Sequence, residues 1–119
     1  MIRIKRIYDR PGPEDGRRIL VDRVWPRGIR KDEARLDDWL KVLAPSTALR
    51  KWFGHDPARW DEFQTRYRVE LDDPAIGEIL DRLAAEARSD TVTLLFGAKD
   101  EQRNQAVVIG QLVEERLKG

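Results

Sequence analysis

Two short apolar runs restrict the architecture of this 119-residue chain more than any of its other features. Ile19-Leu20-Val21 lies within an expected strand at residues 18–23, and Thr91–Phe96 forms a second β-branched and apolar run. The first run is continuously apolar rather than alternating, which is typical of a strand covered on both faces. Helical patterns fill the sequence between the two runs. As neighbours in a sheet, the two strands would therefore be parallel, and both would end at the same edge.

The rest of the chain predicts one further strand and four to five helices. Residues 2–8 alternate imperfectly and read as the first strand, whereas the Pro- and Gly-rich segment 11–16 reads as a loop. Helices are expected over Leu36–Leu43, from Ser46 or Thr47 to Gly54, after Asp56-Pro57, after Asp73-Pro74 and after Asp100. The sequence therefore predicts a small single α/β domain over residues 1–119, with about three strands, the second and third of them parallel.

The near-neutral net charge of +1 hides a strong asymmetry along the chain. Residues 1–31 hold ten Lys and Arg against four Asp and Glu, whereas residues 32–119 hold thirteen against eighteen. The basic part either attracts anions or pairs with acidic groups of the helical part. The chain has no cysteine, which excludes disulfides and thiolate nucleophiles. It also has no apolar stretch as long as a membrane span and no signal-peptide core, so a cytoplasmic protein is expected.

The segment after the second strand carries more chemistry than a connecting loop needs. Asp22, Arg23, Trp25 and Arg27 lie here, and a parallel arrangement would bring them near the loop after the third strand. Lys99, Asp100 and Asn104 follow the third strand, and the loop leads into the N-terminus of the last helix, whose free N–H groups favour an anion. Arg23, Arg27 and Lys99 are therefore predicted to neutralise a phosphate or carboxylate, with Trp25 and Asn104 as further ligand contacts.

Other interpretations of the same residues remain open. Asp22 and Asp100 are candidates to accept protons, hold a metal or orient the arginines, and the alternative is an Arg–Asp network that ties the loops together without a ligand. Trp25 either packs under its loop or lines a pocket. His55, the only histidine, is a catalytic candidate or simply a turn residue between two helices.

Gly97 lies six positions before Arg103, directly after a buried strand. The oxyanion loops of thiol-dependent phosphatases and sulfurtransferases have this spacing, but they carry cysteine at the position of Gly97. The chain therefore cannot run their chemistry, although such a loop can still bind an oxyanion.

Several longer motifs resemble one family. They are Val21-Asp22-Arg23-Val24-Trp25-Pro26-Arg27-Gly28, Leu43-Ala44-Pro45-Ser46, Leu49-Arg50-Lys51-Trp52-Phe53-Gly54-His55-Asp56, Leu94-Leu95-Phe96, Ala98-Lys99-Asp100, and the single residues Trp60, Phe63, Tyr67 and Asn104. Together they resemble the YeaO-like group of small bacterial proteins, within a larger family of unknown function. The resemblance implies a compact cytosolic α/β domain. Relatives commonly carry histidine before the asparagine at Asn104, where this chain has Arg103, so no histidine-based metal site and no cofactor are expected.

Three functions are compatible with these observations. The first is binding of a small anionic ligand, and an enzyme built on this site would be a hydrolase or group transferase without a cysteine nucleophile. No dinucleotide-binding fingerprint is present. The second is nucleic-acid binding through Lys5, Arg6, Arg17, Arg18, Arg30 and Lys31. The third is a protein-interaction module that uses the Trp25-Pro26-Arg27-Gly28 loop. A monomer or weak homodimer is expected.

Overall fold

The computed structural model describes all 119 residues as a parallel sheet surrounded by helices. The strands are β1 (Ile2–Arg6), β2 (Arg17–Leu20), β3 (Asp38–Trp39) and β4 (Val92–Phe96). The α-helices are α1 (Lys31–Ala34), α2 (Thr47–Phe53), α3 (Trp60–Leu71), α4 (Pro74–Ser89) and α5 (Gln105–Lys118), and short 3₁₀ turns lie at Pro13–Asp15, Lys41–Leu43 and Pro57–Arg59. None of the helices combines the length and apolarity needed to cross a lipid bilayer.

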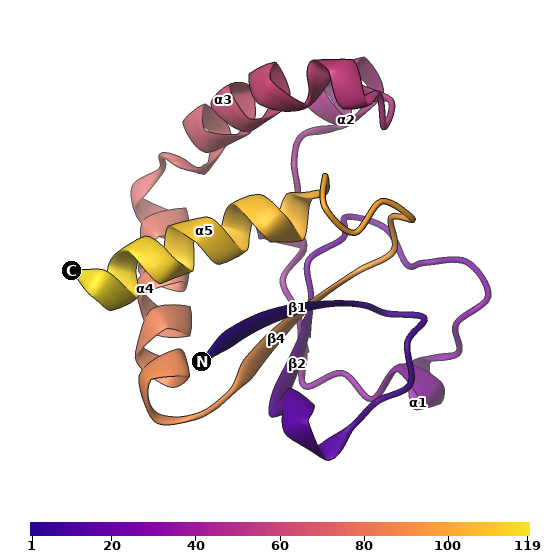
Figure 1. Cartoon of the computed structure of the whole chain (residues 1–119), viewed down its shortest axis with the longest axis vertical. Helices are drawn as coiled ribbons and strands as arrows, with labels where there is room; N and C mark the ends of the chain where they lie inside the picture. The colour runs from indigo at the N-terminus through magenta and orange to yellow at the C-terminus, as the bar shows by residue number, and fades with distance from the viewer.

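The sheet has the strand order β1-β4-β2-β3, and all neighbouring strands are parallel. The two apolar runs are paired at its centre, with Ile19 opposite Leu94, which confirms the prediction that these strands are parallel neighbours. Figure 1 shows α5 passing beside β1 and β4, and α2 lying near the loop where β4 turns into α5. The loops after β2 and β4 therefore leave the sheet at the same edge.

Alternate residues of the central strands face two separate apolar clusters. Ile19 and Leu94 belong to the main core, which they share with the buried faces of α3, α4 and α5. Leu20 and Leu95 belong to a smaller cluster with Ile7, which the segment containing α1 covers. Because both faces are covered, the central strands carry continuous apolar runs rather than an alternating pattern.

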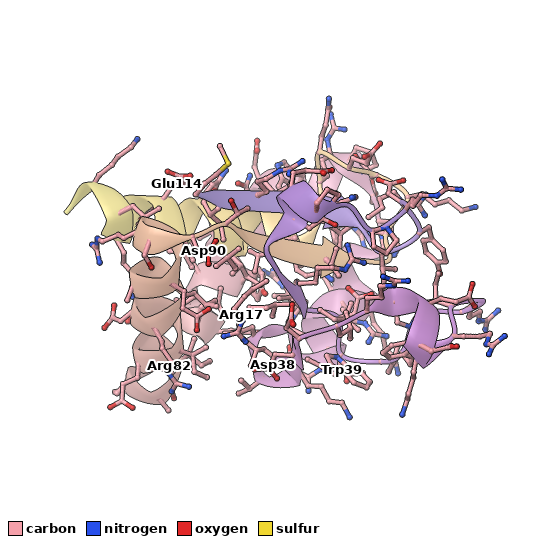
Figure 2. All side chains as sticks on the ribbon, turned by 90° about the horizontal axis from the view of Figure 1, so that it is seen from below. Arg17, Asp38, Trp39, Arg82, Asp90 and Glu114 are labelled. Carbon is pink, nitrogen blue, oxygen red and sulfur yellow. The ribbon has the colours of Figure 1, made fainter.

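The helix predicted over Leu36–Leu43 is wrong. The chain leaves α1 through Arg35 in the left-handed conformation, at φ 49°, and then forms the two-residue strand β3 against β2. Trp39 packs on the smaller cluster, whereas Leu40 packs on the main core. Successive side chains of a strand point to opposite faces, but in a helix they lie on neighbouring positions of one surface. Figure 2 shows Asp38 and Trp39 at the margin of the sheet.

Several helices begin and end at the capping residues that the sequence predicts. The exceptions are α1, which was not predicted, and α5, which begins at Gln105 with Asn104 as its cap rather than directly after Asp100. Ser46 accepts a hydrogen bond from the Leu49 N–H at the start of α2, and Gly54 ends this helix with φ 54°. Asp56 caps the 3₁₀ turn before α3, and Asp73 caps α4. These signals depend on residues close together in the chain, so the sequence reveals them directly.

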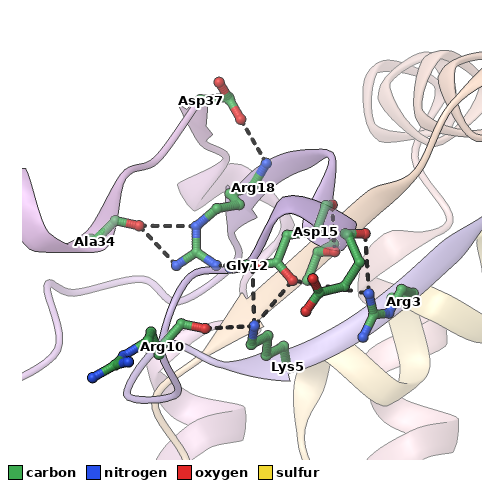
Figure 3. Close-up of polar contacts among 10 residues, drawn as sticks. Arg3, Lys5, Arg10, Gly12, Asp15, Arg18, Ala34 and Asp37 are labelled. Carbon is green, nitrogen blue, oxygen red and sulfur yellow. Dashed lines mark hydrogen bonds and ion pairs between the residues drawn. The ribbon is translucent and has the colours of Figure 1, made fainter.

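A buried charge network joins the first two strands to the segment between them (Figure 3). The Asp15 carboxylate is fully buried and pairs with Lys5 at 3.0 Å and with Arg18 at 2.5 Å. The Arg18 guanidinium also donates to the Ala34 carbonyl at the end of α1. Burial alone would raise the pKa of Asp15, but hydrogen bonds from the Gly12 N–H, Lys5 and Arg18 outweigh it and hold this pKa below its ordinary value.

Candidate functional site

A cleft of about 420 Å³ opens at the carboxyl ends of β2 and β4. Its walls come from the loop after β2, from the end of α2 with the following turn, and from the loop between β4 and α5. Tyr8, two residues beyond β1, completes the lining. The position is the edge of a parallel sheet at which α/β proteins bind ligands, and the volume falls within the ~300–1,000 Å³ usual for small-molecule sites.

Basic side chains dominate the charge of this cleft. Arg23, Arg27, Arg50 and Lys51 line it, against the single carboxylate of Asp22. None of these four cations forms an ion pair within the protein. Their positive charge is therefore available to an anion that enters the cleft.

The cleft includes six residues that the sequence singled out, namely Asp22, Arg23, Trp25, Arg27, His55 and Asn104. Sequence reasoning missed Arg50 and Lys51, which lie in the last turn of α2. The sequence does show two basic residues just before Gly54, which ends the helix. However, the local sequence does not reveal that this end of the helix lies against the loop after β2.

Asp22 lies at the floor of the cleft and is held from two sides. The Gly97 N–H donates to one carboxylate oxygen at 2.9 Å, and the Gln105 side-chain amide donates to the other. Burial raises the pKa of Asp22 to about 6, although these hydrogen bonds and the nearby charge of Arg50 favour the ionised form. Asp22 therefore changes its charge close to physiological pH.

Asp22 also occupies the space that a side chain at position 97 would need. A Cβ atom built on Gly97 would lie 2.8 Å from the Asp22 Oδ2 atom and 3.5 Å from Pro26. This is the position at which thiol-dependent enzymes with the same loop spacing carry their cysteine. The Asp22 carboxylate can therefore occupy its position only because residue 97 has no side chain.

The rest of the loop after β4 is occupied by its own carboxylate. Asp100 accepts hydrogen bonds from the N–H groups of Gln102 and Arg103 at 3.0 and 3.2 Å, and it pairs with the Arg103 guanidinium at 3.3 Å. The Gln102 N–H bond is the main reason why the pKa of Asp100 lies below its ordinary value. The Asp100 carboxylate therefore occupies the N–H groups of this loop, which were expected to bind an anionic ligand.

Lys99 and Asp100 were predicted as site residues, but neither lines the cleft. Lys99 is exposed, and Asp100 belongs to the internal network of the loop. Asp100 thus stabilises its own loop, whereas the alternative interpretation places it in a network between the two loops.

Arg23 and Asn104 have structural contacts in addition to their place in the lining. Arg23 donates through Nε and Nη2 to the carbonyls of Pro45 and Ala44, both at 3.1 Å, and so joins the loop after β2 to the segment before α2. Asn104 is buried, accepts from the Val107 N–H and caps α5. Arg23 keeps its Nη1 group free for a ligand, whereas Asn104 is largely committed to the helix end.

Trp25 combines both roles that the sequence left open for it. Its indole N–H donates to the Ile29 carbonyl, and its ring packs edge-on against Trp39 with centroids 5.4 Å apart. The half-buried ring nevertheless lines the cleft.

His55 lies at the cleft mouth, in the turn between α2 and the 3₁₀ turn before α3. It is exposed and has a left-handed φ of 57°, which fits its interpretation as a turn residue. The structure contains no group of three His, Cys, Asp or Glu side chains that could hold a metal ion.

Comparison with known proteins identifies the family. Residues 1–119 match the model of the family described as the inactive DUF488-N3 subclade. The chain belongs to this family.

Relatives match the chain over nearly its whole length. An uncharacterised protein of Mycobacterium tuberculosis H37Rv is 43% identical over 115 residues, covering 97% of this chain and 95% of the relative. The uncharacterised protein YeaO of Escherichia coli K12 is 43% identical over 109 residues, covering 91% and 92%. The resemblance to the YeaO-like group is confirmed. No solved structure matches the chain.

Proposed function

We propose that this DUF488-N3 protein binds a small phosphate- or carboxylate-bearing molecule in the cleft. The observation that carries the proposal is the convergence of four cations, free of ion pairs, on a pocket with one carboxylate. Arg50 and Lys51 come from α2, whereas Arg23 and Arg27 come from the loop after β2. Two segments far apart in the chain therefore contribute charge of the same sign, and an anion between them would relieve that repulsion.

The proposed role is binding rather than turnover. The family is described as inactive, and Gly97 offers no nucleophile in a loop whose spacing is similar to that of thiol enzymes. Asp22 fills the space beside Gly97 and accepts its N–H, so this backbone group is not available to a ligand. Both features support a site that holds an anion on its basic walls.

The test is isothermal titration calorimetry with inorganic pyrophosphate and citrate as probes. We expect Arg50→Ala to weaken binding by about tenfold or more, because a charge-assisted hydrogen bond contributes roughly 1.5–3 kcal/mol. Arg82→Ala is the matched control, since Arg82 is exposed on α4 and does not line the cleft. Failure of both probes to bind, or equal losses in the two variants, would contradict the proposal.

A further inference from the structure

The cleft offers more than a simple anion requires, because aromatic rings alternate with its cations. The loop after β2 presents Arg23, Trp25 and Arg27 to the cleft, with the ring between the two arginines. From α2 and the turn after it, Phe53 and His55 line the cleft together with Arg50 and Lys51. Each wall thus combines cations with an aromatic surface.

The rings of the first wall are held in place by polar contacts at their edges. The Trp25 indole N–H is anchored on the Ile29 carbonyl, and Trp39 supports the ring from the side. Tyr8 donates its hydroxyl to the Arg27 carbonyl at 2.7 Å while its side chain stays 40% exposed. A ring that is fixed and still exposed loses little conformational entropy when a planar group stacks on it.

The floor provides hydrogen-bond acceptors beside these rings. Each Asp22 oxygen accepts one protein hydrogen bond, and a carboxylate oxygen has room for a second. The side-chain oxygen of Gln105 has no partner within the protein, because only its amide nitrogen is bonded to Asp22. Acceptors of this kind suit the amino edge of a nucleobase rather than a second anionic group.

From this combination we infer that the ligand is a nucleoside monophosphate. The phosphate contacts the basic side chains, the base stacks on Trp25, and an exocyclic amino group donates toward Asp22. The inference rests on the proposed anion-binding function and names the ligand class of the same site. The volume of about 420 Å³ lies in the lower part of the range for small-molecule sites, which favours a single nucleotide over a polymer.

The test compares AMP, ribose 5-phosphate and inorganic pyrophosphate by calorimetry on the full chain. We expect AMP to bind at least about tenfold more tightly than ribose 5-phosphate, because stacking of a base on an aromatic ring strengthens binding by about this factor or more. Trp25→Leu should reduce the ratio of the two affinities to about one, because it removes the ring on which the base stacks. Trp25→Phe, which keeps an aromatic ring and so controls for folding, should retain most of the advantage.

The outcomes separate the two proposals. Equal affinities for AMP and ribose 5-phosphate, or an AMP preference that survives in Trp25→Leu, would overturn the nucleotide inference while anion binding stands. Binding of none of the three probes would remove both. Tighter binding of a 5′-phosphorylated oligonucleotide than of AMP would assign the site to a nucleic-acid end and overturn the free nucleotide as its ligand.

Discussion

Asp22 and Gly97 are the two residues on which the chemistry of the cleft depends most. Each explains the other, because the carboxylate fits only where position 97 has no side chain, and the Gly97 N–H holds it there. The pair places a titratable acid, and no nucleophile, at the start of the loop after β4. The consequences are a steric constraint and a pH dependence, and both can be measured.

Gly97→Ala should destabilise the protein by roughly 1–3 kcal/mol, because the added methyl group overpacks against the Asp22 carboxylate. Gly77→Ala is the control. A Cβ at this α4 position meets nothing within 4 Å, so alanine should stabilise the helix by up to about 1 kcal/mol. Urea unfolding measures both changes. Repeating Gly97→Ala in an Asp22→Ala background should reduce its effect, and an undiminished loss there would disprove the contact.

Asp22 should make the protein less stable as pH rises from about 4 to about 6. Its pKa is raised from 3.8 to about 6 in the folded state, so the native protein holds this proton more tightly than the unfolded chain does. The resulting stabilisation is present below pH 4 and is lost as the carboxyl ionises, amounting to about 3 kcal/mol at most. Urea unfolding across this range should show the free energy of unfolding of wild type falling, relative to that of Asp22→Asn, by up to this amount. Parallel curves would refute the raised pKa.

The ionisation of Asp22 should also change the affinity of the cleft for anions, because Asp22 is its only carboxylate. Below pH 6 the floor of the cleft becomes uncharged while its arginines and lysine stay positive, so affinity for an anion of constant charge should increase as pH falls. A sulfonate probe titrated into His55→Gln between pH 5 and 8 tests this without an imidazole contribution. Asp22→Asn in the same background should bind with little dependence on pH.

At the scale of elements, the Asp15 network links β1 and β2, the two strands that lie on either side of β4. Lys5 comes from β1, Arg18 from β2 and Ala34 from α1, and Thr93 of β4 donates to the Asp15 carbonyl at 2.7 Å. Bonds to the carboxylate and the backbone carbonyl of Asp15, and from Arg18 to Ala34, therefore join three strands and a helix. Figure 3 shows the part of the network that involves Lys5, Arg18 and Ala34. Because these charges are buried, removing one partner would leave the other as an unpaired buried charge, which strongly destabilises the folded state.

Asp15→Ala should lower the free energy of unfolding by about 3–5 kcal/mol, since it leaves the buried Arg18 without its carboxylate. Asp32→Ala is the matched control. It removes an ion pair with Arg30 in which both side chains are well exposed, and such pairs contribute less than about 1 kcal/mol. Chemical denaturation measures the difference. Similar losses for both variants would show that the network has no special energetic weight.

Helices and strands were predicted correctly where their signals lie in the local sequence. The prediction failed where pairing with another strand determines the backbone conformation. The helices capped by Ser46 and Asp73 begin as expected. The segment around Trp39 has helix-like apolar spacing, but the backbone of β2 accepts the Leu40 N–H at 2.9 Å and holds the chain extended. A two-residue strand has too little sequence of its own to show that pairing.

At the scale of the whole molecule, the basic N-terminal third has fewer side chains free to contact nucleic acid than its net charge indicates. Four of the six side chains proposed for nucleic-acid contacts bond to groups within the fold. These are Lys5, Arg6, Arg17 and Arg18. Arg30 pairs with acids at the surface, which leaves Lys31 without an acidic partner. Few of these six side chains are therefore free to contact the phosphates of a duplex.

We expect no mobility shift with duplex DNA or RNA at about 0.15 M salt, and at most a weak shift at low salt. Arg17→Ala, which breaks the pair with Glu86, should leave this result unchanged. A retarded band that persists at the higher salt concentration would revive the nucleic-acid interpretation.

The local sequence is sufficient for the two central strands, for most helix ends and for the edge of the sheet at which the cleft forms. Apolar runs, capping side chains and prolines act on neighbouring backbone groups, so their effect is visible in the chain itself. The content of the cleft depends instead on contacts between distant segments. The approach of Arg50 to Asp22, the packing of Asp22 into the space beside Gly97 and the withdrawal of Asp100 into its own loop exist only after the sheet has brought these segments together.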